Sequence, residues 1–67
     1  MNIENLKTFI TLSELKNFTQ TADRYFIVQS TVTNRIMELE KELGKKLFIR
    51  NRKNVELTEE GQHFLAY

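Results

Sequence analysis

The sequence contains no cysteine and a single histidine, His63, among its 67 residues. Without cysteine there is neither a disulfide framework nor a thiolate metal site, and one histidine supplies too few of the commonest neutral metal ligands. No apolar run approaches the roughly 20 residues that span a bilayer, and the N-terminus lacks the basic start and apolar core of a signal peptide. We therefore expect a cytoplasmic chain with no metal, no cofactor and no membrane segment.

The groups that enzymes use for catalysis are missing as well. The sequence offers no nucleophile paired with a base, no cluster of metal ligands and no glycine-rich phosphate loop. We interpret Glu38, Glu40 and Glu42 as surface carboxylates that pair with nearby lysines, since no apolar pocket is available to tune one of them for acid–base work. We therefore expect that the chain is not an enzyme.

Charge is unevenly distributed, although the formal net charge is only +1. Residues 1–28 hold three basic and three acidic residues, residues 29–54 hold seven basic and three acidic, and residues 55–67 hold three acidic and no basic ones. Within residues 45–54 there are five basic residues and no acidic one. Such a run is either a solvated surface or a patch that contacts phosphates, and charge alone favours the solvated surface.

The first helix is expected to begin near Asn2, an acceptable N-cap residue. Its apolar positions recur at helical spacing with nothing polar interleaved, which indicates core packing for all of them. These positions are Ile3, Leu6, Phe9, Ile10 and Leu12. Asn17, with Gln20 three residues later, forms a capping-box pattern that should end this helix and begin a second one at Phe18.

Residues 17–44 form the pattern around which the chain is organised: a short helix, a tight turn and a longer helix. The longer helix carries a narrow apolar stripe with the 3.6-residue period, which must be buried. The stripe consists of Val32, Ile36, Leu39 and Leu43. Gly44 follows directly, where a left-handed glycine ends a helix. Residues 26–28 are too few for a paired strand, so we interpret them as the turn of a helix-turn-helix, with Ile27 packed into the core.

The opposite side of the longer helix carries short or amide side chains that donate and accept hydrogen bonds. Near its N-terminal end these are Gln29, Ser30, Thr33 and Asn34. Helix-turn-helix geometry places such residues in the major groove of DNA. Glutamine and asparagine can each form a bidentate pair with adenine, and hydroxyl groups can bond bases or phosphates. These four residues are therefore candidate base-contacting residues.

Two short apolar segments after the longer helix predict a two-stranded hairpin. Residues 47–49 and 55–57 flank a charged turn at residues 50–54. Thr58 then caps a fourth helix, with acidic residues in its first turn. Because the helical pattern runs to the end of the sequence, we expect this helix to continue in a longer protein.

Several motifs in one register resemble the N-terminal winged helix-turn-helix of LysR-type transcriptional regulators. They are NFTQTADRY (17–25), Gln29–Ser30, LEKELG (39–44), the LF.R pattern (47–50) and LTEEG (57–61). The resemblance extends over essentially all 67 residues without a gap. It implies a mainly α fold with a three-helix core, a short two-stranded β-wing and the start of a C-terminal linker helix.

The resemblance also implies a function and a division of the chain. Residues 1–57 would be the DNA-binding domain of a bacterial regulator that recognises an inverted-repeat operator in double-stranded DNA. Residues 58–67 would begin a helix through which the full-length protein forms a homodimer. A small-molecule effector would act only through a C-terminal domain that this sequence does not contain.

Individual contacts follow from the same resemblance. Thr19 resembles the family's phosphate-contacting hydroxyl at the start of the second helix, and Gln29 matches its base-contacting glutamine. The wing residues expected on the DNA backbone are Arg50, Arg52 and Lys53.

Thr21 and Glu60 each replace a frequent alanine of the family without a threat to the fold, and three further departures bear on the contacts with DNA. Val28 stands where a serine or threonine commonly caps the third helix, which removes a cap worth about 1 kcal/mol and one phosphate contact. Asn34 replaces a frequent arginine, which predicts an adenine preference or a lost contact in place of guanine recognition. Met37 stands where a basic residue is common. It can be interpreted as a contact to a thymine methyl group or, preferably, as a semi-exposed structural methionine.

Two functions remain open from the sequence. One is sequence-specific binding of duplex DNA, which the polar helix face, the basic wing and the resemblance favour. The other is a winged-helix module that binds protein and has no DNA specificity, for which the near-neutral net charge is the only support. Binding that does not respond to salt would favour the protein-interaction module.

Overall fold

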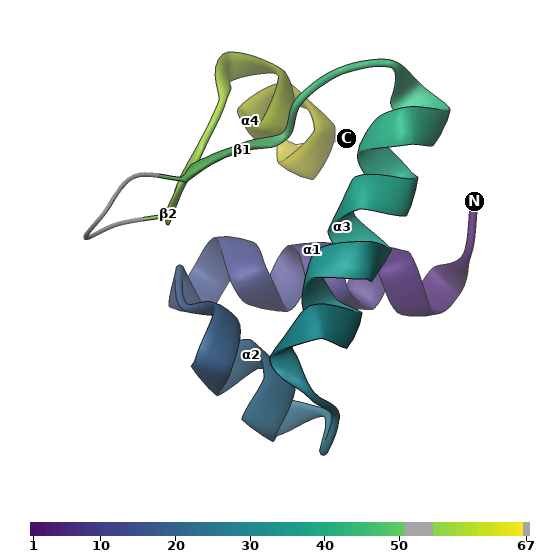
Figure 1. Ribbon diagram of the computed structural model, residues 1–67. Helices are drawn as coiled ribbons and strands as arrows, with labels where there is room; N and C mark the ends of the chain where they lie inside the picture. The colour runs from purple at the N-terminus through teal and green to yellow at the C-terminus, as the bar shows by residue number, and fades with distance from the viewer. Residues whose placement is uncertain (51–54, 67) are drawn as a thin grey trace.

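Four helices and one two-stranded antiparallel sheet make up the part of the chain that the structure, a computed structural model, describes: residues 1–50 and 55–66. In sequence order the elements are α1 (Ile3–Leu15), α2 (Phe18–Arg24), α3 (Gln29–Leu43), β1 (Phe48–Arg50), β2 (Val55–Leu57) and α4 (Glu59–Ala66) (Figure 1). The predicted mainly α, winged helix-turn-helix architecture is confirmed. No helix in these two ranges is long and apolar enough to cross a membrane.

Local caps fix the ends of the helices as the sequence predicts. The Asn2 side chain accepts a hydrogen bond from the backbone N–H of Glu4 at 2.7 Å, and Asn17 accepts one from Gln20 at 2.8 Å. The Thr58 hydroxyl accepts from the backbone N–H of Gly61 at 3.0 Å, which caps α4. Each cap satisfies an N–H group that has no partner within its own helix.

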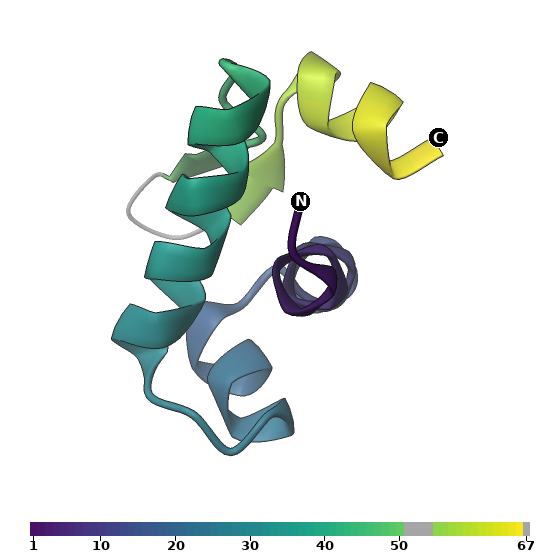
Figure 2. The same cartoon turned by 90° about the vertical axis from the view of Figure 1, so that its right-hand side faces the viewer.

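The core lies where α3 crosses α1 and runs beside α2. Figure 2 looks along α1 and shows α3 passing it on one side. On α3, Val32 and Leu39 are completely buried and Ile36 is 4% exposed, so most of the predicted stripe lies in the core. Leu43 is partly buried against the same cluster. Gly44 ends α3 with φ +68°, as its position in the sequence predicts.

The expected apolar stripe of α1 is wrong in two positions. Ile3 is 67% exposed and Ile10 is 47% exposed, so neither packs in the core. Instead the helix buries a neighbouring face with the spacing i, i+3, i+4 and i+7. That face consists of Asn5, Thr8, Phe9 and Leu12.

Hydroxyl groups on α1 explain why polar residues replace isoleucines in the core. The Thr8 hydroxyl donates to the Glu4 carbonyl at 2.8 Å, so it is satisfied within its own helix and can be buried. Tyr25, at the end of α2, donates to the Lys7 carbonyl at 3.1 Å, and the Thr11 hydroxyl lies 2.7 Å from the same phenol oxygen. These bonds let α1 turn its threonines inward and join it to α2.

The hairpin is attached to α3 by one carboxylate. A side-chain oxygen of Glu40 accepts hydrogen bonds from the backbone N–H groups of Leu47 at 2.8 Å and Phe48 at 3.3 Å, where β1 begins. The Glu40 side chain is only 11% exposed. Glu40 pairs with a nearby lysine as predicted, Lys46 at 4.0 Å, but its placement on the surface is wrong. It is mostly buried because it accepts hydrogen bonds from two backbone donors.

The fourth helix packs back onto the core through one aromatic contact and one close backbone approach. The ring of Phe64 meets that of Phe9 edge-on, with centroids 5.2 Å apart. Gly61 is buried against the start of β1, where a Cβ atom would collide with the Leu47 carbonyl oxygen and lie 2.8 Å from a Leu57 methyl group. That carbonyl also accepts a hydrogen bond from the Thr58 N–H at 2.9 Å.

Replacing Glu40 with alanine tests the attachment of the hairpin. We expect Glu40→Ala to lower the free energy of unfolding by about 1–3 kcal/mol, because two backbone N–H groups lose their acceptor. Urea denaturation followed by circular dichroism measures the change. Glu38→Ala is the matched control on the exposed side of the same helix and should stay within about 0.5 kcal/mol of the parent chain. Equal effects would show that Glu40 is only a surface charge.

Replacing Gly61 with alanine tests the close approach of α4. In an open helix this change stabilises by about 0.5–1 kcal/mol, whereas here the added methyl group meets a fixed carbonyl. We therefore expect Gly61→Ala to destabilise the chain by about 1–3 kcal/mol. Thermal unfolding beside the exposed neighbour Gln62→Ala measures it, and a rise in melting temperature for Gly61→Ala would contradict the packing described.

Candidate nucleic-acid interface

One side of α3 is free of core contacts and carries the predicted base-contacting residues. Gln29, Ser30 and Asn34 are exposed, and Thr33 is half-buried, with its hydroxyl donating to the Gln29 carbonyl at 3.3 Å. The burial of Val32 and Ile36 on the core side turns these four residues outward, because both sets follow the same helical period. We call Gln29, Ser30, Thr33 and Asn34 the recognition face.

The start of α3 lacks a side-chain cap. Val28 is the N-cap residue, its side chain makes no capping hydrogen bond, and it is 65% exposed. The lost cap that the sequence predicts is therefore confirmed. Ile27 before it is partly buried against the core, as expected, and the turn is closed by a hydrogen bond from its N–H to the Ala22 carbonyl at 3.0 Å.

Arg50 on β1 lies against the start of α2. Its guanidinium carbon sits 4.0 Å from the centroid of the Phe18 ring, a cation–π contact that holds an otherwise exposed side chain in place. Phe18 is the first residue of α2, and the exposed Thr19 follows it. The structure thus brings Arg50 to the α2 end that carries Thr19. Arg52 and Lys53, the other predicted wing contacts, lie outside the described residues.

A groove of about 440 Å³ joins the recognition face to the hairpin. Thr33 and Met37 line it from α3, while Ile49 and Arg50 line it from β1. Met37 is 57% exposed and Ile49 is 55% exposed, so both apolar side chains border the groove without entering the core. A phosphate- or base-contacting role for Thr33 and Arg50 would therefore involve one continuous surface.

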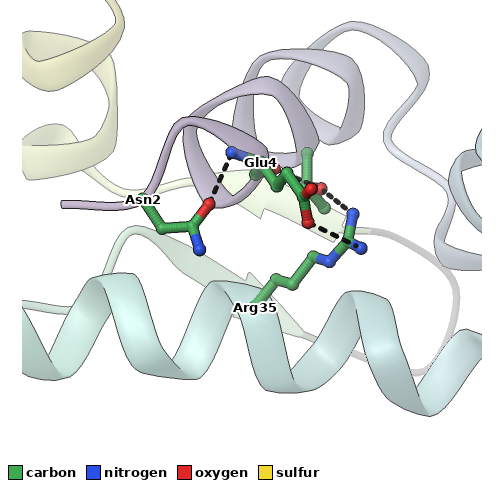
Figure 3. Close-up of polar contacts among 4 residues, drawn as sticks. Asn2, Glu4 and Arg35 are labelled. Carbon is green, nitrogen blue, oxygen red and sulfur yellow. Dashed lines mark hydrogen bonds and ion pairs between the residues drawn. The ribbon is translucent and has the colours of Figure 1, made fainter.

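A second arginine, which the sequence did not single out, faces the opposite way. Arg35 reaches from α3 to α1, where it donates to the Thr8 hydroxyl at 3.2 Å and to a Glu4 carboxylate oxygen at 3.4 Å (Figure 3). Glu4 and Arg35 are 31 residues apart, so no local spacing could have indicated the pair.

The titratable groups of residues 1–50 and 55–66 bear on whether a metal ion could be held there. No cluster of three or more histidine or acidic side chains could hold a metal ion there. The interface offers amides, hydroxyls, exposed apolar groups and an ordered guanidinium, which suit hydrogen bonding to base edges and attraction to phosphates.

Comparison with known proteins agrees with this architecture. The family model described as "Bacterial regulatory helix-turn-helix protein, lysR family" matches residues 3–62. The HTH-type transcriptional activator IlvY of Haemophilus influenzae is 48% identical over all 67 residues, and the HTH-type transcriptional regulator CitR of Bacillus subtilis is 43% identical over the same span.

Solved structures share the fold closely. The BenM_DBD/catB site 1 DNA complex superposes with a TM-score of 0.93 at 36% identity, over all of this chain and 75% of that one. The CbnR_DBD–DNA complex gives 0.93 at 35% identity, over 98% of this chain and 76% of that one.

The alignments cover the whole of this chain but only part of each curated relative. All of this chain is covered, but it spans 23% of the length of IlvY and of CitR. Because the family model covers most of the sequence and the identity holds over its whole length, the chain belongs to the lysR family of bacterial regulatory helix-turn-helix proteins.

Proposed function

We propose that this chain is the operator-recognising domain of a LysR-type transcriptional regulator. It binds double-stranded DNA sequence-specifically, with α3 in the major groove and the hairpin on the flanking backbone. Such a function uses no catalysis by the chain itself, and it would place the protein in the bacterial cytoplasm, where the chromosome lies.

The observation that carries this proposal is the outward orientation of the recognition face. Its amide and hydroxyl groups can pair with base edges, and they project from the N-terminal half of α3, the part that enters the groove in helix-turn-helix proteins. Two of the structural neighbours, BenM_DBD and CbnR_DBD, are themselves complexes with DNA. We assign DNA binding in this chain to the recognition face because it is the polar side of α3 that the core leaves exposed.

The backbone contacts would come from the start of α2 and from the hairpin. Thr19 stands at the start of α2, and Arg50 is held beside it by the Phe18 ring. We include Arg52 and Lys53 from the sequence alone, because they carry positive charge in the segment between β1 and β2 and positive charge attracts phosphates. Together these residues would set the orientation on the duplex, and the recognition face would select the sequence.

Residues 1–57 would form the DNA-binding unit and residues 58–67 the beginning of a dimerisation helix. A homodimer would then present two copies of α3 to an inverted repeat. Linking two recognition units raises affinity through effective concentration, so the chain by itself should bind one half-site weakly. Any small-molecule effector would act through parts of a longer protein.

Alanine at the recognition face tests sequence-specific binding. We expect Gln29→Ala with Thr33→Ala to reduce the preference for an AT-rich inverted-repeat duplex over a scrambled one by roughly tenfold or more, since a bidentate base contact contributes about 1–3 kcal/mol of discrimination. Fluorescence anisotropy titrations of both duplexes measure it. Gln62→Ala, which removes an exposed amide on α4, should leave the preference unchanged. Unaltered discrimination in the double variant would refute the proposal.

The salt dependence separates DNA binding from protein binding. We expect log K to fall linearly with log salt, and Arg50→Ala to make that slope shallower by about 0.9 while weakening both duplexes by a similar factor. Lys7→Ala, on α1, is the charge-matched control. Binding that ignores salt in the parent chain would instead support the protein-interaction module.

A further inference from the structure

The only arginine or lysine between Gln29 and Met37 is engaged inside the chain. Arg35 is bonded to the fully buried Thr8 hydroxyl and to Glu4, and its side chain is 21% exposed (Figure 3). Arginine is the side chain that most often recognises guanine in the major groove. This stretch of α3 therefore presents no free guanidinium with which to read a guanine.

Met37 lies beside the recognition face, whereas Arg35 points away from it. Residues three, four and seven apart share one side of a helix, which places Met37 beside Asn34, Thr33 and Ser30. A step of two residues, in contrast, turns the helix by about 200°, so Arg35 points away from that side. At 57% exposure the Met37 thioether continues the recognition face by one further turn.

The chemistry of this extended face matches one base. Thymine is the base that carries a methyl group in the major groove, and apolar side chains recognise it by direct contact. Methionine is flexible and polarisable, so it adapts to such a contact. Asn34 can at the same time pair with an adenine. Asn34 can therefore contact the adenine, and Met37 the thymine, of A·T pairs.

We propose that Met37 is a specificity-determining residue that contacts a thymine 5-methyl group, while Arg35 is a positioning residue that holds α3 against α1. The inference rests on the proposed function and names the chemistry of that same surface. Ile49 lies across the groove from Met37 and adds one apolar side chain on the hairpin side, next to Arg50.

Removing single methyl groups from the DNA tests the contact directly. Duplexes are first selected from a randomised library with this chain, and each thymine of the selected half-site is then replaced by deoxyuridine. We expect one position at which the loss of the methyl group weakens binding roughly fourfold, the effect of one buried methyl group. Met37→Ala should bind the thymine duplex that much more weakly and be indifferent to deoxyuridine at this position.

Matched variants make the outcome decisive. Ile10→Ala, an exposed apolar truncation on α1, should keep the full sensitivity to deoxyuridine. Arg35→Gln should leave the slope of log K against log salt unchanged, because the guanidinium touches no phosphate. Circular dichroism confirms that each variant is folded before titration.

Two results would overturn this inference while leaving the proposed function in place. One is a deoxyuridine penalty that is absent in the parent chain or equal in Met37→Ala at every position. The other is a slope that falls by about 0.9 in Arg35→Gln, which would mean that Arg35 leaves α1 for a phosphate. Sequence-selective binding without methyl sensitivity would leave the proposed function standing. A library that yields no preferred sequence would refute both.

Discussion

The burial of one side of α3 is the constraint on which the rest of the structure depends. Val32 and Leu39 are fully buried and Ile36 nearly so, and a helix held along one stripe cannot rotate about its axis. The direction in which the outward side chains project is thereby fixed. The polar side chains of the recognition face do not disturb folding, because only the opposite side of α3 is buried in the core.

Features that depend on neighbouring residues were predictable from the sequence. Asn17 and Thr58 cap helices at the expected places, Gly44 ends α3, and the period of the apolar stripe gave the correct inward side of that helix. Each follows from backbone donors or dihedral angles within a few residues. The exposure of Gln29 and Thr19 was likewise predictable, since it follows from the helix boundaries.

Features that depend on distant or compensating contacts were not predictable. The side of α1 that is buried contains Thr8 in place of Ile3, because a hydroxyl bonded to its own helix removes the penalty for burying it. Phe26 adopts φ +55° without glycine, although side chains rarely occupy that region. The hydrogen bond between Arg35 and Glu4 joins residues 31 positions apart, and the spacing of residues within one helix cannot predict such a pair.

The hairpin is attached to α3 at Glu40, far along the helix from the recognition face. Glu40 is 11 residues from Gln29, a length of about 16 Å of helix, and the two lie near opposite ends of α3 (Figure 1). A tilt of about 5° at the Glu40 end displaces the other end by roughly 1.4 Å, several times the spread of good hydrogen-bond lengths. Under the proposed function, a displacement of that size at Gln29 would change which base edges the recognition face can reach. Under the proposed function, sequence preference would depend on the packing of the whole fold as well as on the chemistry of a few side chains.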